Sequence, residues 1–112
     1  MRVVIGPSLI LSQLPRSTEP GDYDWFDIEW ADTQVGKSRC RIEPDRLTIF
    51  SIMIYPEYER HGFGYAVIEF FKTRHEVIIA DRVRFTARNF WVKLDFVAET
   101  EDRYVWRRSE PT

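Results

Sequence analysis

The chain has 112 residues, of which 30% are charged and 44% are hydrophobic, and its formal net charge is −2. This length suits a single domain spanning residues 1–112, and the composition is that of a globular protein rather than a disordered one. The slightly negative charge argues against a protein whose main partner is a nucleic-acid backbone, so no nucleic-acid partner is expected.

Cys40 is the single cysteine, so the chain can form no internal disulfide and no thiolate metal cluster. The first residues lack the long apolar core and the cleavage site of a signal peptide. No apolar run approaches the roughly 20 residues that cross a bilayer. We therefore expect a cytoplasmic protein with no metal site and no membrane partner.

The N-terminal part predicts strands followed by a loop. Short apolar clusters at residues 3–5 and 9–11 predict one or two strands. Residues 14–24 contain two prolines and a glycine and predict a loop. This segment is too short and too broken for a pair of packed helices.

Three further strands are expected in the middle of the chain. Residues 25–32 and 37–43 each alternate between apolar and polar side chains, which predicts two half-buried strands paired as a hairpin, with a turn region at residues 32–37 that includes Gly36. Residues 46–56 are almost continuously apolar and rich in β-branched residues. This pattern predicts a strand that is covered on both faces at the centre of the sheet.

A glycine pair, Gly62 and Gly64, separates that strand from an amphipathic helix. From Phe63 the apolar residues recur at positions i, i+3, i+4, i+7 and i+8, the spacing of one helix face. Residues 76–83 then predict a strand, so a strand–helix–strand unit with two parallel strands is expected. Glycines at a helix start let an anion approach the unpaired N–H groups of the first turn. A plain helix entry is the alternative, since short glycine patterns also occur by chance.

The C-terminal part predicts a second helix and a hairpin. Apolar residues at helical spacing in residues 87–94 predict the helix. Residues 96–99 and 103–108 predict two antiparallel strands. The whole pattern indicates an α+β fold, with a mixed central sheet of antiparallel N-terminal strands, then a βαβ unit, and two packed helices.

Two segments carry motifs of a known family. Residues 54–67 read IYPEYERHGFGYAV, and residues 87–96 read ARNFWVKLDF. In this order they resemble the acyl-CoA motif V-x-P-E-Y-R-G-K-G-I-G-x-A-L and the motif A-x-x-F-Y-x-K-L-G-F of the GCN5-related N-acetyltransferases (GNAT). The resemblance covers residues 23–108 and implies a short, three-layer GNAT-like domain that transfers an acetyl group from acetyl-CoA to an amine.

The resemblance also implies where coenzyme A (CoA) binds. Main-chain N–H groups of the glycine loop would hold the pyrophosphate, and the preceding strand would pair its main chain with the pantetheine arm. An N–H near Ile54 would stabilise the oxyanion. The candidate cofactor-binding residues are Met53, Ile54, Arg60, His61, Gly62, Phe63, Gly64, Tyr65, Arg84 and Arg88.

The catalytic candidates are Glu29, Trp91 and Tyr65. Glu29 is the first candidate for the base. The alternative, which is commoner for such a residue, is that Glu29 is an exposed carboxylate on a strand without a catalytic role. Trp91 stands where the family often has the tyrosine that protonates the leaving thiolate, and an indole N–H is not a useful acid at neutral pH. Tyr65 or Tyr104 is the candidate replacement. Glu59 stands where the family usually has arginine or glutamine, and its carboxylate repels a pyrophosphate.

The sequence is compatible with three functions. The first is an N-acyltransferase in which a neutral amine attacks the thioester directly. The second is a CoA-binding regulatory module without turnover, and the third is an interaction protein that keeps only the fold. The family's first two helices are replaced here by a loop, so the acceptor site is either open to a macromolecule or completed by a second subunit. An exposed C-terminal strand would favour a homodimer.

Overall fold

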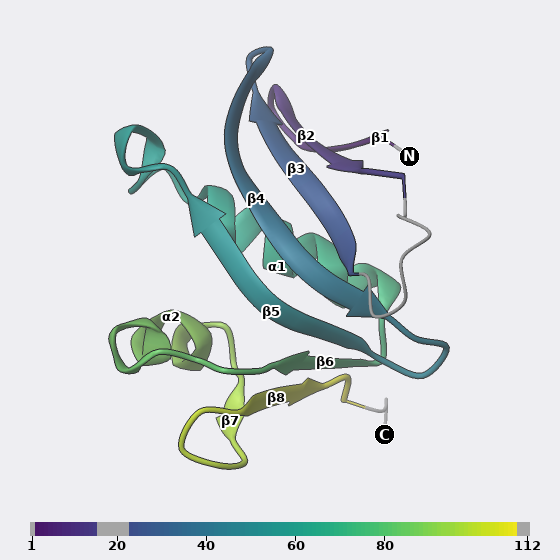
Figure 1. Ribbon diagram of the computed structural model, residues 1–112, viewed down its shortest axis with the longest axis vertical. Coiled ribbons are helices and arrows are strands. Elements are labelled where there is room, and N and C mark those ends of the chain that lie inside the picture. Colours follow the sequence, from purple (N-terminus) through teal and green to yellow (C-terminus); the bar gives the residue numbers. More distant parts are fainter. Residues whose placement is uncertain (1, 16–22, 110–112) are drawn as a thin grey trace.

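The computed structural model describes residues 2–15 and 23–109. Their eight strands form one mixed sheet in the order β1-β2-β3-β4-β5-β6-β8-β7 (Figure 1). The N-terminal strands, each antiparallel to the next, are β1 (Arg2–Gly6), β2 (Leu9–Gln13), β3 (Asp24–Trp30), β4 (Thr33–Ile42) and β5 (Leu47–Ile54). Both expected N-terminal strands are therefore present. Most of the expected loop, residues 16–22, lies outside the described residues, and β3 already begins at Asp24.

The strand–helix–strand unit is confirmed. Strand β6 (Val77–Ala80) pairs in parallel with β5, and helix α1 (Phe63–Arg74) connects the two. Strand β5 is also central in the sheet, as expected. The expected cover on both its faces is wrong, because Leu47 and Ile49 are buried on one face while Met53 is 51% exposed on the other.

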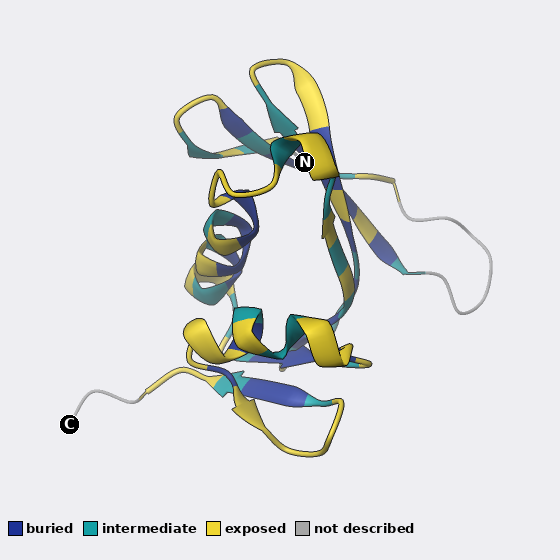
Figure 2. Cartoon of the chain, turned by 90° about the vertical axis from the view of Figure 1, so that its left-hand side faces the viewer, coloured by how far each residue is buried: buried dark blue, intermediate teal, exposed yellow. Residues whose placement is uncertain are grey.

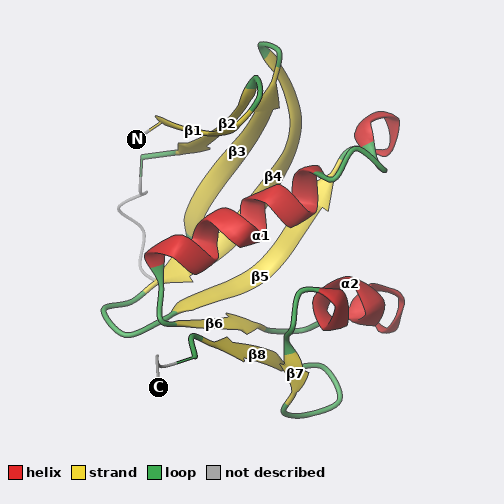
Figure 3. Ribbon diagram, turned by 180° about the vertical axis from the view of Figure 1, so that it is seen from behind, coloured by secondary structure: helices red, strands yellow, loops and turns green. Residues whose placement is uncertain are grey.

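Both helices lie on one face of the sheet. Figure 3 shows α1 crossing in front of the strands and α2 (Arg88–Lys93) beside β6. Two short 3-10 helices, η1 (Pro56–Tyr58) and η2 (Phe85–Ala87), precede them. The expected α+β fold with a mixed sheet and two packed helices is confirmed for the described residues. They form two layers where three were expected, because both helices share one face (Figure 3), and we call the other face the open face. None of the described helices is long and apolar enough to cross a bilayer.

The hairpin of β3 and β4 forms, and its turn lies at the beginning of the expected turn region. Trp30 pairs with Thr33, so the turn consists of Ala31 and Asp32, whose φ angles are 49° and 66°. Two positive φ angles suit a two-residue hairpin. The rest of the expected turn region, residues 33–37, is wrong, because these residues belong to β4, where Gly36 lies opposite Ile54 of β5.

The C-terminal hairpin has an unexpected position in the sheet. Strands β7 (Val97–Ala98) and β8 (Tyr104–Arg107) are antiparallel, as expected. However, β8 pairs with β6 on its other side, so it is interior and β7 forms the edge. The expected dimer contact through an exposed C-terminal strand is therefore not available to β8.

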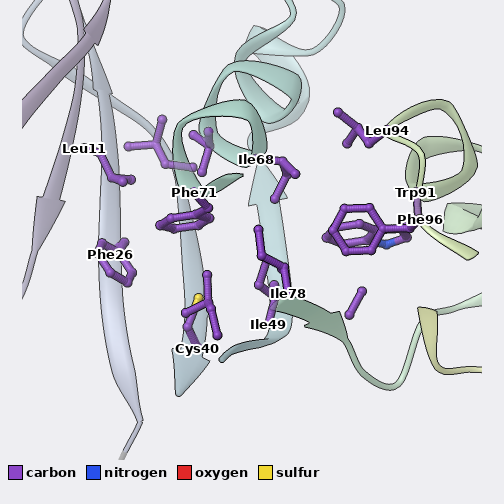
Figure 4. Packing of buried hydrophobic residues seen from close by; sticks show 14 of the residues in the cluster. Leu11, Phe26, Cys40, Ile49, Ile68, Phe71, Ile78, Trp91, Leu94 and Phe96 are labelled. Carbon is purple, nitrogen blue, oxygen red and sulfur yellow. The ribbon is translucent and has the colours of Figure 1, made fainter. Parts of the chain in front are cut away.

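The core lies between the sheet and the two helices. Helix α1 turns its buried side toward the strands (Figure 2), and Phe63, Val67 and Phe71 are buried there as the spacing predicted. Ile68, outside that spacing, is also buried, whereas the expected Ala66 and Phe70 are only half-buried. Figure 4 shows Phe71 between Phe26 and Cys40 on one side and Ile68 on the other. Trp91, Leu94 and Phe96 extend the same core around α2.

Cys40 is fully buried in this core, and burial raises the pKa of its thiol to about 12. Between the ordinary value of 9.0 and 12, the unfolded chain releases a proton that the folded chain keeps. The free energy of unfolding must therefore fall as the pH rises through this range, by about 1.4 kcal/mol per pH unit from this group. We expect the wild type to lose about 1 kcal/mol more than Cys40→Ala between pH 9 and pH 10.

Urea unfolding at pH 8, 9 and 10 checks this expectation. The slopes of unfolding free energy against pH are compared for the wild type and Cys40→Ala. The contributions of other groups that titrate in this range cancel, since both proteins contain them. Parallel pH profiles for the wild type and Cys40→Ala would show that the thiol ionises in the folded state as easily as in the unfolded chain.

Candidate functional site

Strands β5 and β6 separate halfway along β5. Their pairing ends where Ile49 meets Ala80, and the last main-chain hydrogen bond runs from the Asp81 N–H to the Ile49 oxygen at 2.9 Å. At this point β5 also carries a bulge, because Arg39 pairs with Ser51 and Cys40 pairs with Ile49, which leaves Phe50 as the extra residue. A bulge bends its strand. The second half of β5 is thus paired only with β4 and runs away from β6.

A cleft of about 720 Å³ fills the gap between the separated strands. On the helix side it is lined by Gly64 of α1 and by Phe90 and Trp91 of α2. On the other side it reaches Arg39 and Phe50, which stand on the open face. The same cleft therefore passes through the sheet from one face to the other.

The cleft has a free strand edge along one wall. The Tyr55 N–H donates to the Val35 oxygen at 2.8 Å, so the main chain of Tyr55 faces β4. In a strand every second residue directs its main chain to the same side, so Met53 also faces β4, whereas Ile52 and Ile54 face the cleft. Their N–H and C=O groups offer a ladder of hydrogen bonds to an extended ligand.

The glycine loop leads into the first turn of α1. Gly62 is the residue before the helix and has φ +79°, a left-handed conformation that favours glycine. The Ala66 N–H donates to the Gly62 oxygen at 3.0 Å, and no side chain caps the helix. The N–H groups of residues 63–65 therefore lack partners within the helix, and the helix dipole favours an anion beside them.

Gly64 has a different role from Gly62. An added Cβ at Gly64 would lie 3.0 Å from Cε1 of Phe90 and 3.9 Å from a side-chain carbon of Ile54, whereas one at Gly62 would meet nothing within 4 Å. Gly64 thus allows the start of α1 to pack closely on α2 beside the cleft, and Gly62 supplies the backbone angle of the loop.

The structure distributes the predicted cofactor-binding residues over two zones. Those that line the cleft are Met53, Ile54, Gly64 and Arg84. The others, outside its lining, are Arg60, His61, Gly62, Phe63, Tyr65 and Arg88. The His61 ring is stacked against Trp30 at 5.8 Å and against Phe63 at 5.3 Å, which fixes the loop to the end of β3. Arg88 lies over Phe85, with its Cζ 4.7 Å from the ring centroid.

The three catalytic candidates are not brought together. Glu29 accepts a hydrogen bond from Arg2 at 2.9 Å and does not line the cleft. Tyr65 is 37% exposed and packs on Phe90, with ring centroids 5.1 Å apart. Trp91 alone of the three lines the cleft; it is buried and packs on Phe96 at 4.9 Å.

Asp81 and Arg39 are among the residues that line the cleft but were not expected as site residues from the sequence. Asp81 is half-buried and follows directly after β6, at the point of strand separation. A carboxylate at the carboxyl end of a parallel strand is a recognisable sequence signal for a site. Arg39 had no such signal, because only the bulge in the neighbouring strand opens the cleft next to it.

The chain matches no family model and no curated protein sequence. It is similar to the solved structure of the Bacillus subtilis N-acetyltransferase YlbP in complex with coenzyme A, with a TM-score of 0.63 and 22% identity over 78% of this chain and 69% of that chain. The E. coli protein YhhK bound to coenzyme A has a TM-score of 0.72 and 9% identity over 89% and 98% of the two chains. A GNAT family acetyltransferase from Elizabethkingia anophelis with acetyl-CoA bound has a TM-score of 0.67 and 4% identity over 92% and 100%. At these identities the likeness shows a shared fold.

Proposed function

We propose that this chain, which has the GNAT fold, is an acetyl-CoA-dependent N-acyltransferase of the cytoplasm that acts on an amine. The observation that carries this proposal is the cleft between β5 and β6. It joins a free strand edge to the open first turn of a helix, and it continues through the sheet to the open face. A cofactor with an extended arm and a pyrophosphate requires the first two features, and a second substrate requires access from the other side.

The residues present fit acetyl-CoA. A volume of about 720 Å³ is in the range of small-molecule sites. The main chain of Ile52 and Ile54 would pair with the pantetheine arm, and the N–H groups of residues 63–65 would bind the pyrophosphate. When bound, acetyl-CoA supplies an activated acyl thioester.

Acyl transfer by direct attack requires a donor for the developing oxyanion and an acceptor for the proton of the amine. The Ile54 N–H faces the cleft and fits the first role. We assign the second role to Asp81, acting directly or through water, because its carboxylate lines the cleft whereas Glu29 is held by Arg2 elsewhere. Trp91 forms a wall of the cleft, and its indole N–H can donate a hydrogen bond but not a proton.

A CoA-binding module without turnover is the second candidate function. It is favoured by Trp91 and Glu59, both of which line the cleft. The first offers no acid for the leaving thiolate, and the second places a negative charge in the wall of a site for an anion.

Two measurements test the proposal. Calorimetry with CoA and with acetyl-CoA is expected to show binding, and a thiol-detecting reagent is expected to show release of CoA with at least one amine of a broad panel. Absence of binding at millimolar CoA would reject both candidate functions. Binding without thiol release from any amine would favour the module without turnover.

Replacing Glu59 by glutamine is expected to raise the affinity for CoA about fivefold. One charge pair at about 4 Å in water is worth about 1 kcal/mol, and Glu59 is exposed, so the gain stays modest and shrinks with added salt. Calorimetry at two salt concentrations measures the change.

Glu57→Gln is the matched control for Glu59→Gln, because Glu57 is also exposed in this loop and does not line the cleft. It is expected to change the affinity less than twofold. If Glu59→Gln bound CoA more weakly than the wild type, the carboxylate would have a favourable role in the loop.

A further inference from the structure

Three arginines gather on the open face at the mouth of the cleft. Their Cζ atoms lie 5.9 Å (Arg39), 5.8 Å (Arg41) and 5.7 Å (Arg82) from the centroid of the Phe50 ring. Tyr23 packs edge-on against Phe50 at 5.1 Å and contacts Arg39 at 4.7 Å. We call Arg39, Arg41 and Arg82 the arginine cluster. In a chain with a net charge of −2, this is a local concentration of positive charge.

Contact with the aromatic rings does not use the hydrogen-bond donors of these arginine side chains. A guanidinium stacked on a ring uses its face, whereas its five N–H donors point outward in its own plane. The Nε of Arg39 is buried and has no hydrogen-bond acceptor among the described residues. The stacking therefore orients the three guanidinium groups around Phe50, and the Nε–H of Arg39 has no acceptor among the described residues.

No carboxylate of the described residues neutralises the cluster. Among these residues, none of its three arginines forms an ion pair. On the same face, Asp27 accepts a hydrogen bond from Gln34, and Glu29 pairs with Arg2. Asp81 accepts the main-chain N–H of Arg82 at 3.0 Å. Like charges held this close, with no counter-charge in the part of the chain that the structure describes, repel each other, and a bound anion relieves that repulsion.

The cluster also belongs to the cleft. Arg39, Phe50 and Arg82 line the same cleft as Gly64 and Phe90, which stand at its opposite end. A molecule held by the cluster would therefore meet the cleft from the face opposite the first turn of α1. We propose that the arginine cluster binds an anionic oxygen group, a carboxylate or a phosphate, carried by the acceptor amine. This inference rests on the proposed acyltransferase function.

Planar guanidinium donors bind both carboxylate and phosphate in pairs of hydrogen bonds, so the test compares both anions. The full chain, saturated with acetyl-CoA, is supplied with propylamine, with β-alanine or with 2-aminoethyl phosphate, and thiol release is followed. In parallel, the arginine Nε–H signals of the CoA-bound protein are followed by NMR while each amine is added. At least one anionic amine is expected to react with a kcat/KM at least about tenfold above that of propylamine and to shift the Arg39 Nε–H signal.

Arg39→Gln is expected to reduce the ratio of kcat/KM for the anionic amine over propylamine about tenfold or more. It is also expected to abolish the shifts that anionic amines cause in the remaining arginine Nε–H signals. Arg74→Gln is the matched control, because Arg74 also stacks on a ring, Phe70 at 5.2 Å, but on α1. It is expected to keep the preference. Circular dichroism and calorimetry with CoA on both variants separate a folding defect from a loss of the anion site.

The outcomes distinguish this inference from the proposed function. The better of the two anionic amines identifies the group as a carboxylate or a phosphate. Equal responses to all three amines, or a preference that survives Arg39→Gln, would overturn the inference while CoA binding stands. Absence of CoA binding would overturn the proposed function, and with it the role of the cluster in holding an acceptor.

Discussion

Gly36→Ala is expected to lower the free energy of unfolding by about 3 kcal/mol or more. A Cβ at this position would collide with the main-chain oxygen of Met53 and would lie 3.1 Å from Cα of Ile54. Both atoms belong to the backbone of β5, so no side-chain rotation relieves the contact. The two central strands have to move apart, and a domain of this size has only about 5–15 kcal/mol of stability to lose.

Urea unfolding of Gly36→Ala measures the effect. Gly6→Ala is the control, because a Cβ there would lie 3.7 Å from Cβ of Leu9, an ordinary contact. It is expected to change the stability by less than about 0.5 kcal/mol. A Gly36→Ala protein within 1 kcal/mol of the wild type would mean that β4 and β5 are packed less closely than the structure has them.

The sequence predicted correctly those parts of the fold in which a local pattern of apolar residues determines which side of a helix or strand is buried. Three of the five residues at the apolar spacing, Phe63, Val67 and Phe71, are buried on the inner side of α1. The parallel pairing of β5 and β6 follows from the helix between them, because parallel neighbours require a crossover connection.

The parts that the sequence missed depend on contacts between strands. The two positive φ angles in the turn of the first hairpin belong to Ala31 and Asp32. Because neither residue is a glycine, the sequence did not indicate that the turn consists of these two residues. The glycine nearby, Gly36, is required by the close approach of β5 instead. The bulge at Phe50 depends on the register with β4, and no local pattern in the sequence indicates it.

The candidate site shows the same division. Its glycine loop was visible in the sequence, because a helix start with unpaired N–H groups is a local feature. The arginine cluster was not, since Arg39, Arg41 and Arg82 come from two segments that meet only around the Phe50 ring. The motifs thus indicated the glycine loop, whose binding of the cofactor stays a prediction, whereas the side proposed to face the acceptor required the tertiary structure.

Gly62→Val is expected to weaken CoA binding by tenfold or more while the chain stays folded. A β-branched residue is strained at φ +79°, so the loop has to change its backbone angles. This change redirects the N–H groups at the start of α1, which would otherwise point at the pyrophosphate. The strain is relieved locally, because nothing lies within 4 Å of an added Cβ and Gly62 is exposed. Calorimetry with CoA, together with circular dichroism, measures both effects.

Gly6→Val is the matched control for Gly62→Val, since Gly6 ends an edge strand without a positive φ angle and does not line the cleft. It is expected to bind CoA like the wild type. The pair of variants separates the conformation of the loop from a general loss of stability, because only Gly62 sets the direction of the first-turn N–H groups. Normal CoA binding by Gly62→Val would remove the glycine loop from the cofactor site. The free edge of β5 would then be left as the main support for a cofactor in this cleft.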